Sequence, residues 1–346
     1  MKIYLEGYFN CNLGDDLFFY MLLKRYKNVE FYTCTNVCIE YMKNLKGIKY
    51  NKFINKLLNF LHLNNLSTKQ RVIQKMDAIV LLGGSMFIES KKKYDNTKYN
   101  YLFNCSKPYF IIGTNFGPYF SQGYYNNALK IFKNANDVTF RDNKSYTCFS
   151  SELSNVRMAN DIIFSLKSKK NKKIRENKKA IISVINGQNR NFDENIYYNN
   201  LIYIYNFFKD RNYEICFMSF CEAEGDESEI VKIMNDINDE KAKKYFYRGN
   251  IEEALALINS ADVVVGSRFH ANILGIVYDK VVIPLAYSDK TIDALTDISF
   301  NGRIYDLRKN EKIILKDEDL IYKKNMFDDK SVNVHFEKLD NYLRRK

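Results

Sequence analysis

The chain has 346 residues and a formal net charge of +12, with 46% hydrophobic and 27% charged residues. This is the composition of a globular protein and excludes wholesale disorder, and the length predicts two domains of ordinary size. No apolar run reaches the roughly 18 residues that a membrane span requires, and residues 1–9 form a strand pattern rather than a signal peptide. We therefore expect a cytoplasmic protein.

The positive charge has two interpretations. It can reflect an anionic partner, or only a compositional bias, because Lys and Asn are abundant throughout the chain rather than clustered in one segment. The charge alone is compatible with nucleic acid, a phosphorylated substrate or an acidic membrane face. Taken with the motifs described below, it leads us to expect a phosphorylated substrate and a peripheral contact with an anionic membrane, and no nucleic acid. The seven cysteines are scattered without a CxxC pair, which favours reduced thiols over a zinc site or a disulfide framework.

Apolar runs rich in branched residues recur along the chain and predict β-strands. They cover residues 2–9, 29–34, 78–84, 109–115, 138–142, 180–187, 214–220, 263–267 and 281–287. Stretches long enough for helices lie between many of them, among them 13–26, 122–135 and 195–210. Continuous apolar strands that alternate with helices indicate parallel sheets covered on both faces, which is the α/β class.

A basic stretch near the middle of the chain divides these elements into two groups. We predict an N-terminal domain over 1–166, a lysine-rich solvated linker over 167–179 and a C-terminal domain over 180–330. Residues 331–346 form a terminal helix that we expect to cross back onto the first domain. The expected architecture is two doubly wound, Rossmann-like domains that face a central cleft.

Ligands of open parallel sheets bind beyond the carboxyl ends of the strands. After the first strand, Asn12, Gly14 and Asp15 form either a simple helix start or a substrate-side loop in which Asn12 and Asp15 accept hydrogen bonds from hydroxyls. A later strand ends in Gly83-Gly84-Ser85, which is either a tight turn or a loop whose backbone N–H groups approach an anion.

Two further strand ends of the first domain carry candidate ligands. Asn115 and Gly117 follow the strand at 109–115, where the backbone must bend sharply before Pro118. Arg141 ends the next strand, and its guanidinium can hold a carboxylate or phosphate of a ligand bidentately, or can pair structurally with Asp142 or another carboxylate.

The stretch VVVGSRFHANILG, Val263 to Gly275, carries the strongest candidates. It predicts a central strand, an exit at Ser267 and a helix that begins with Arg268 and His270 at its positive end, which suits an anion. The alternative is a histidine that caps its own helix beside an arginine paired with a carboxylate. Other strand ends supply a rim, whose members are Ser219, Asp226, Tyr287, Ser288 and Lys290.

These positions together resemble the polysaccharide pyruvyl transferase family. The matching motifs, in order, are Asn12-Leu13-Gly14-Asp15, Gly83-Gly84-Ser85, Gly113 to Pro118, Arg141 to Ser145, Asp161 to Phe164 and Ser267-Arg268-Phe269-His270. The resemblance implies a fold similar to the two-domain glycosyltransferase B architecture. It also implies transfer of the enolpyruvyl unit of phosphoenolpyruvate onto two hydroxyls of a sugar, which gives a pyruvate ketal and phosphate.

The chemistry that the resemblance implies suggests roles for the candidates. We expect Arg268 to clamp the anion, His270 to act as general acid or as donor to the departing phosphate, and Asp15, the weaker candidate, to orient or deprotonate the sugar hydroxyl. Arg141 is expected as a second anion contact if domain closure brings it near. The sugar acceptor, linked to a nucleotide or a lipid, falls to the first domain and phosphoenolpyruvate to the second, and no metal or other cofactor is expected.

Two other functions remain as alternatives. One is a glycosyltransferase of the same fold, in which Arg268 and His270 contact the diphosphate of a nucleotide sugar. The other is a non-catalytic sugar-binding protein, which the presence of both side chains disfavours.

Overall fold

The computed structural model describes residues 1–36, 39, 41–51, 53–54, 57–58, 67–92, 95–103, 105–166, 178–188, 190–324 and 331–345. The chain divides into two compact units. Unit 1 comprises Met1–Phe9, Leu17–Ile162 and Asp329–Lys346, and unit 2 comprises Asn10–Asp16 and Ile163–Asp328. The break thus falls at Ile162, and the C-terminal segment belongs to unit 1. Most of the predicted linker, 167–177, lies outside the described residues.

Unit 1 is built on a seven-stranded parallel sheet of order β3-β2-β1-β4-β5-β6-β7. Its strands are β1 (Lys2–Glu6), β2 (Glu30–Cys34), β3 (Leu45–Ile48), β4 (Ala78–Leu82), β5 (Tyr109–Thr114), β6 (Asp137–Phe140) and β7 (Val156–Met158). Its helices are α1 (Leu13–Arg25, whose first turn belongs to unit 2), α3 (Thr68–Gln74), α4 (Gln122–Asn134), α5 (Asn143–Phe149) and α11 (Asn333–Arg344). The strand order reverses between β1 and β4, which is the doubly wound arrangement.

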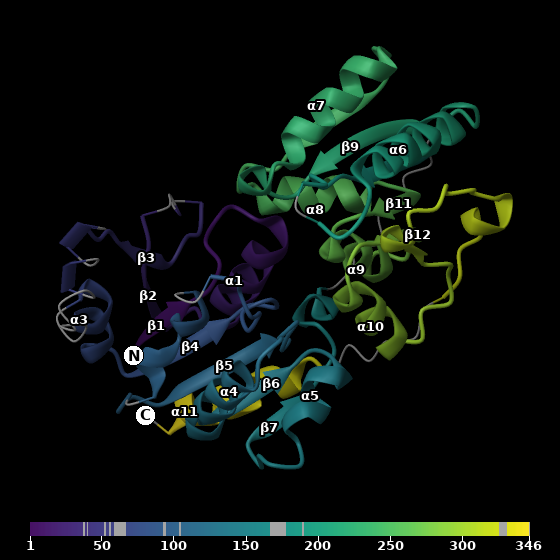
Figure 1. Cartoon of the computed structure of the whole chain (residues 1–346). Coiled ribbons are helices and arrows are strands. Elements are labelled where there is room, and N and C mark those ends of the chain that lie inside the picture. Colours follow the sequence, from purple (N-terminus) through teal and green to yellow (C-terminus); the bar gives the residue numbers. More distant parts are fainter. Residues whose placement is uncertain are drawn as a thin grey trace. The chain divides into compact units, whose positions relative to one another are not determined.

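Both faces of this sheet are covered (Figure 1). Tyr109 and Ile111 of β5 pack into one core with Phe132 of α4. Phe110 points to the opposite face, because neighbouring residues of a strand alternate, and its ring lies 5.5 Å from that of Tyr342 in α11. The C-terminal helix is therefore an integral layer of unit 1.

Unit 2 contains a six-stranded parallel sheet of order β10-β9-β8-β11-β12-β13. Its strands are β8 (Lys179–Ser183), β9 (Glu214–Ser219), β10 (Lys243–Phe246), β11 (Val263–Gly266), β12 (Val281–Ala286) and β13 (Tyr305–Asp306). Its helices are α6 (Glu194–Lys209), α7 (Asp226–Ile237), α8 (Ile251–Asn259), α9 (Phe269–Val277) and α10 (Asp289–Asp297). The strand order reverses between β8 and β11.

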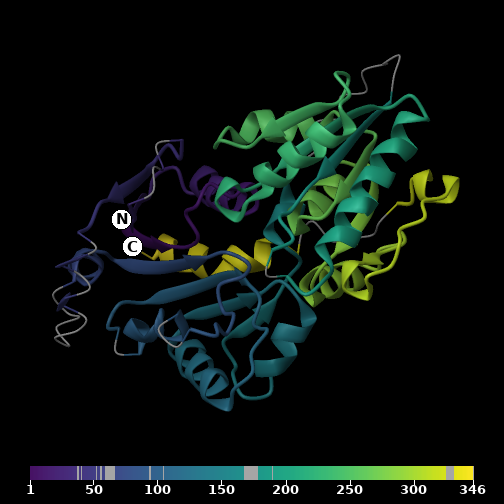
Figure 2. The same ribbon diagram turned by 45° about the horizontal axis from the view of Figure 1, so that its top comes forward.

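Alternating residues of β11 face two different layers. Val263 and Val265 join a core that includes Leu201 of α6, whereas Val264 faces α9. Helix α9 approaches the sheet closely at Gly275, where an added Cβ would lie 3.2 Å from the Cβ of Val264. Figure 2 shows the helices of this unit from a second direction. The sheet is thus buried on both faces, as its apolar strands predict.

The sequence misses four strands, each for the same reason. These are the edge strands of the two sheets, and each is short and partly exposed: β3, β7, β10 and β13. Edge strands are covered less completely than central ones, so they lack the continuous apolar runs by which the other nine strands are recognised.

Candidate active site in the second unit

The polar residues of unit 2 gather beyond the carboxyl ends of β8, β9 and β11. The strands end at Ser183, Ser219 and Gly266, and β8 and β11 are the neighbours at which the strand order reverses. The hydroxyl of Ser183 accepts a hydrogen bond of 3.0 Å from the backbone N–H of Arg268, which ties the start of α9 to β8. The site therefore occupies the place where doubly wound sheets bind their ligands.

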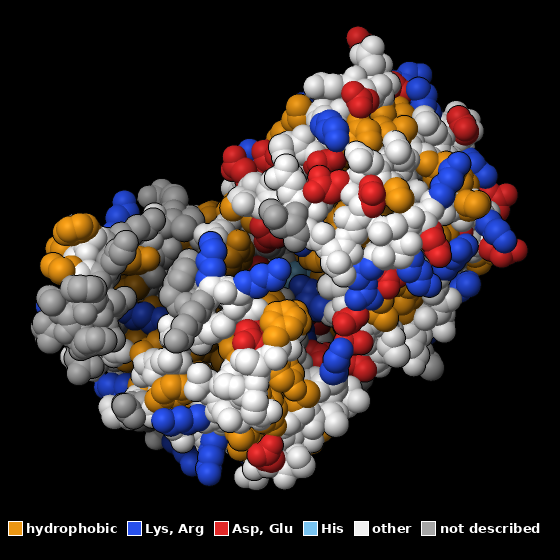
Figure 3. Space-filling model, in the orientation of Figure 1, with side chains coloured by type: hydrophobic (Ala, Val, Ile, Leu, Met, Phe, Trp, Pro, Cys, Tyr) orange, Lys and Arg blue, Asp and Glu red, His pale blue; other side chains and the backbone are white. Residues whose placement is uncertain are grey.

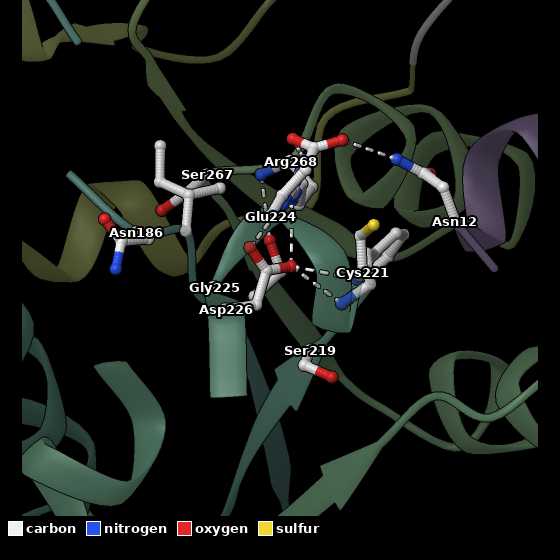
Figure 4. A network of polar contacts seen from close by, with 12 residues as sticks. Asn12, Asn186, Ser219, Cys221, Glu224, Gly225, Asp226, Ser267 and Arg268 are labelled. Atoms are coloured by element: carbon white, nitrogen blue, oxygen red, sulfur yellow. Dashed lines mark hydrogen bonds and ion pairs between the residues drawn. The ribbon is translucent and has the colours of Figure 1, made fainter. Parts of the chain in front are cut away.

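Arg268 lies at the centre of this site (Figure 4). Its Nε donates to Oδ2 of Asp226 at 3.0 Å and its Nη2 donates to Oδ1 of the same carboxylate, which completes a bidentate pair. Its Nη1 donates to Oε2 of Glu224 at 2.6 Å. The guanidinium is buried, and although burial would lower its pKa, the two carboxylates outweigh that effect and raise the pKa.

Asp226 is the more deeply buried of the two carboxylates that pair with Arg268. It is fully buried, and its Oδ2 also accepts hydrogen bonds from the backbone N–H groups of Phe220 at 3.0 Å and Cys221 at 3.1 Å. Burial raises the pKa of Asp226, and Arg268 and these two N–H groups oppose the shift by stabilising the carboxylate. A buried carboxylate with this set of donors fixes the guanidinium in position.

Glu224 is the second, more exposed partner. Its side chain is 29% exposed, and its carboxylate also accepts from Nδ2 of Asn12 at 3.1 Å and from Nη2 of Arg190 at 3.4 Å. Burial would raise the pKa of Glu224, but the charge and hydrogen bond of Arg268, with Arg190 and Lys290, lower it. Glu224 is therefore a carboxylate on which an amide and two guanidinium groups converge.

His270 packs against the loop that leads into α1. An added Cβ on Gly14 would lie 1.7 Å from Nδ1 of His270, so only glycine leaves room for the ring. Asn12 shapes the same turn, because its Oδ1 accepts from the backbone N–H of Gly14 at 3.0 Å. The side chain of Asn12 thus bonds both to the turn at Gly14, which contacts His270, and to the carboxylate of Glu224.

The other predicted residues of unit 2 have defined contacts. Ser267 is buried with its Oγ 2.9 Å from the hydroxyl of Tyr197, and the Oγ of Ser219 accepts from the backbone N–H of Tyr247 at 3.4 Å. The ring of Tyr287 lies 4.4 Å from the Arg190 guanidinium, and the ammonium of Lys290 lies 5.1 Å from the ring of Phe269. Ser219 and Ser267 therefore bond within the fold, and Tyr287 and Lys290 border the Glu224 cluster.

The two acidic residues after Asn12 differ in burial. Asp15 is partly exposed, whereas Asp16 is fully buried and its Oδ2 accepts from the hydroxyl of Tyr247 at 2.8 Å. Asp16 is therefore the structural carboxylate of this turn, and a role for Asp15 toward a sugar hydroxyl stays a prediction.

In unit 1, Arg141 holds together the glycine turn and the loop after β5. Its Nη1 donates to Asp161 at 2.8 Å and its Nη2 to Oδ1 of Asn115 at 2.9 Å, while an added Cβ on Gly84 would lie 2.3 Å from its Cζ. Gly83 is buried with a φ of 149° and Ser85 is exposed. The guanidinium thus rests on Gly84 and is paired with protein groups.

Asn115 and Gly117 shape that same loop. The carbonyl of Gly84 accepts from the backbone N–H of Asn115 at 2.7 Å, and Nδ2 of Asn115 donates to the carbonyl of Gly117 at 3.2 Å. Gly117 has a φ of +95°, a conformation that favours glycine. These contacts explain the residue types structurally, and the predicted anion contact of Arg141 stays a prediction.

The sequence analysis did not propose two residues of this cluster and gave a third another place. Glu224 and Arg190 were not proposed, although Arg190 follows β8, which borders the point where the strand order reverses, and Glu224 follows the neighbouring strand β9. Asp226 was expected on the rim of the cleft and is instead fully buried. The acidic loop after β9 was the available signal, since a buried arginine requires nearby carboxylates.

The comparisons with known proteins address the family directly. A family model described as polysaccharide pyruvyl transferase matches residues 12–289. The chain belongs to the polysaccharide pyruvyl transferase family. The matched span covers the Asn12 turn and the Arg268 and His270 segment, and it confirms the resemblance found in the sequence. A family of this description consists of transferases of polysaccharide biosynthesis. No curated protein matches the chain.

Solved structures support the fold of this family member. UDP-GlcNAc 2-epimerase from Neisseria meningitidis, bound to UDP-GlcNAc, has a TM-score of 0.61 at 10% identity over 100% of both chains. MnaA of S. aureus, solved with UDP, has a TM-score of 0.63 at 9% identity over 99% of this chain and 96% of that one. The predicted glycosyltransferase B class, with two Rossmann-like domains, is confirmed.

The described residues contain neither a cluster of metal-ligating side chains nor a helix that could span a membrane. Across residues 1–345 with the gaps given above, no three His, Cys, Asp or Glu side chains gather as metal ligands. In the same part of the chain, each helix is too short or too polar to cross a membrane. On the face of unit 2 that Figure 3 shows, Lys and Arg are interspersed with Asp and Glu.

Proposed function

We propose that the protein transfers the enolpyruvyl group of phosphoenolpyruvate onto two hydroxyls of one sugar in a polysaccharide or glycan precursor. The products are a cyclic pyruvate ketal and phosphate. The observation that carries this proposal is the seating of His270 against Gly14, beside Arg268, at the carboxyl end of β11. An imidazole and a guanidinium at the carboxyl end of a central strand support this proposal, because doubly wound sheets bind their ligands there.

The reaction needs two proton transfers, which define the work of the site. Addition of the first hydroxyl across the double bond moves one proton to the methylene carbon, which becomes the methyl group of the product. Displacement by the second hydroxyl breaks the bond from C2 to the phosphate oxygen, and the second proton leaves with phosphate. A group that protonates the methylene or the departing phosphate accelerates these steps.

His270 is our candidate for this proton donor. The residue is 9% exposed, and its ring lies against Gly14 and 4.9 Å from the centre of the Phe269 ring. A ring held in this way keeps its orientation through the reaction, which favours proton transfer. Asp15, at the same turn, is our weaker candidate for orienting the sugar hydroxyl.

Arg268 is our candidate for the cation that stabilises the donor. Asp226 occupies its Nε and Nη2, so only the Nη1 side, which now faces Glu224, is oriented toward the partly exposed end of the cluster. The acceptor, a sugar linked to a nucleotide or a lipid, has hydroxyls that aromatic and amide side chains bind well. We propose that the site needs no metal, because the arginines and backbone N–H groups can carry the charge of phosphoenolpyruvate.

The experiment incubates the full chain with phosphoenolpyruvate and a panel of nucleotide- and lipid-linked sugars. We expect release of phosphate together with an acceptor that gains the mass of a ketal-linked pyruvate. The matched variants are His270→Ala, expected to lose most turnover, and His335→Gln, expected to keep it, because His335 is buried in unit 1. Phosphate release equal to wild type in His270→Ala would remove the histidine from the mechanism. Release of a nucleoside diphosphate from a nucleotide sugar would favour the glycosyltransferase alternative instead.

A further inference from the structure

Glu224 lies where an anionic ligand would be expected to lie. Two guanidinium groups, from Arg268 and Arg190, and the amide of Asn12 all donate to its carboxylate. Such a set of converging donors is the arrangement that binds carboxylates and phosphates in ligand sites. Here the anion comes from the chain itself.

The two carboxylates that hold Arg268 are not equivalent. Asp226 is fully buried and its oxygens take two N–H groups of Arg268 and two backbone N–H groups. Glu224 has a side chain that is 29% exposed and contacts only side-chain donors. Loss of Asp226 would leave a buried charge uncompensated, whereas a second anion can replace Glu224 with little loss of contacts.

Arg190 is held in place independently of Glu224. Its Nε donates to the backbone carbonyl of Asn186 at 2.8 Å, and its guanidinium lies 4.4 Å from the centre of the Tyr287 ring. Arg268 is likewise held by Asp226. The donors around Glu224 therefore keep their positions when the carboxylate leaves, which is what a preformed ligand site requires.

The charges of the cluster support the same interpretation. The positive groups that lower the pKa of Glu224 are Arg268, Arg190 and Lys290, and Asp226 is the other carboxylate bonded to Arg268. With Glu224 displaced, the three cations exceed Asp226 by two charges. A phosphate monoester near neutral pH carries close to two negative charges, since its second pKa is about 6.

The chain around Glu224 provides a way for it to move. Glu224 ends a short 3-10 turn, Glu222–Glu224, and the next residue, Gly225, has a φ of +81°. Because glycine adopts both signs of φ readily, a rotation there can carry Glu224 outward while Asp226 stays in α7.

We propose that Glu224 is a built-in competitor: it occupies the phosphate-binding position formed by Arg268, Arg190 and Asn12, and the phosphate group of the donor displaces it. This inference rests on the proposed function for the identity of the donor and adds Arg190 as a ligand of its phosphate. Phosphate then competes with Glu224 for the position. The apparent Kd equals the intrinsic Kd divided by the fraction of protein in which Glu224 has left the position.

The test measures binding of phosphoenolpyruvate and of inorganic phosphate to the full chain by calorimetry. Glu224→Gln removes the competing charge at nearly constant size, and we expect it to bind both probes about tenfold more tightly, as for a position occupied nine-tenths of the time. The matched control is Glu222→Gln, which removes the same charge from the same turn. Glu222 has a side chain that is 65% exposed and faces Arg248, so affinity should stay unchanged.

A second variant tests the cradle itself. Arg190→Ala should weaken binding of both probes by about tenfold, because it removes one charged donor from the phosphate. Thermal unfolding of each variant verifies that the fold is intact. An affinity of Glu224→Gln that equals or falls below the wild-type affinity overturns the inference. The inference is also overturned if neither phosphoenolpyruvate nor inorganic phosphate binds measurably to the wild type or to Glu224→Gln.

The outcomes separate this inference from the proposed function. Tighter phosphate binding by Glu224→Gln, in a protein that transfers no pyruvyl group to any acceptor, supports the competing carboxylate and contradicts the proposed function. Pyruvyl transfer with unchanged affinities in Glu224→Gln supports the proposed function and contradicts the competing carboxylate.

Discussion

Replacement of Gly14 by alanine tests whether the proposed activity depends on the position of the His270 ring against this glycine. The added Cβ would lie 1.7 Å from Nδ1 and 2.6 Å from Cγ and Cε1, whereas ordinary contacts begin at 3.4 Å. The ring must therefore move by about 1.5 Å or the turn must open, and a displacement of about 1 Å in a catalytic group costs on the order of a hundredfold in rate. Overpacking of this kind also costs about 1–3 kcal/mol of stability.

The assay has an activity readout and two structural readouts. Phosphate release from phosphoenolpyruvate, in the presence of an acceptor found with the wild type, should fall about a hundredfold in Gly14→Ala. The chain has three histidines, so isotope labelling of histidine gives a simple spectrum in which the His270 signals should shift. Thermal unfolding should show a lower Tm.

Gly123 offers a matched control. Like Gly14, it is the second residue of its helix, here α4, but an added Cβ would meet nothing within 4 Å. Gly123→Ala should therefore keep full activity and gain up to about 1 kcal/mol from helix propensity. Gly14→Ala that matches Gly123→Ala in rate, Tm and histidine spectrum would refute the reasoning, because it would mean that the ring does not depend on the glycine.

Three further predictions concern unit 1. Burial lowers the pKa of His335 from 6.5 to about 4, so the unfolded chain binds a proton more readily; the stability contributed by the neutral ring is complete above pH 6.5 and is lost as the pH falls toward 4, by up to ~3 kcal/mol. The free energy of unfolding, measured with urea at pH 7 and pH 5, should fall between these two pH values in the wild type and should change less in His335→Gln. An equal change in the two proteins would contradict this prediction. Arg141→Met should cost about 3–5 kcal/mol in the same assay because it leaves the buried Asp161 carboxylate without its guanidinium, and a loss under 1 kcal/mol would argue against that pairing. Phe336→Ala should cost about 3–5 kcal/mol because its ring is buried in unit 1, whereas Glu337→Ala on the same helix, whose exposed carboxylate pairs with Arg157, should cost under about 1 kcal/mol; similar losses would mean that α11 is not packed as described.

The central strands were predictable because a strand that is buried on both faces appears in the sequence as a continuous apolar run, and the long helices lie between these runs. The run Val263–Val265 is apolar throughout since one side meets α6 and the other meets α9. The two residues of β13 carry no such signal, because an edge strand is covered less completely. Residues 10–16 were assigned to the first domain on chain order alone, yet they cluster with unit 2, and only tertiary contacts such as the backbone bond from Leu13 N to the Phe220 carbonyl reveal this.

The composition of the site was less accessible than its location. The position of Arg268 and His270 was predictable because a strand that ends in a glycine and a short polar sequence places them at the carboxyl edge of a sheet, and their roles stay predictions. The partners of Arg268 were not found, since Glu224 and Asp226 lie more than forty positions away and follow a different strand. Long-range pairs of this kind depend on strand order, which local patterns do not specify.

The motif glycines acquire a different physical meaning in the structure. Gly84 was expected either in a tight turn or in a loop whose backbone N–H groups approach an anion, and Gly14 to permit a tight turn. The structure adds a steric reason for each glycine, because an added Cβ on Gly14 would meet the imidazole of His270 and one on Gly84 the guanidinium of Arg141. A glycine in such a position excludes any side chain that would displace the catalytic or binding group above it. The placement of His270 and of Arg141 therefore depends on close contact with a glycine. Gly14→Ala and Gly84→Ala would each disturb one of these contacts without altering any charge.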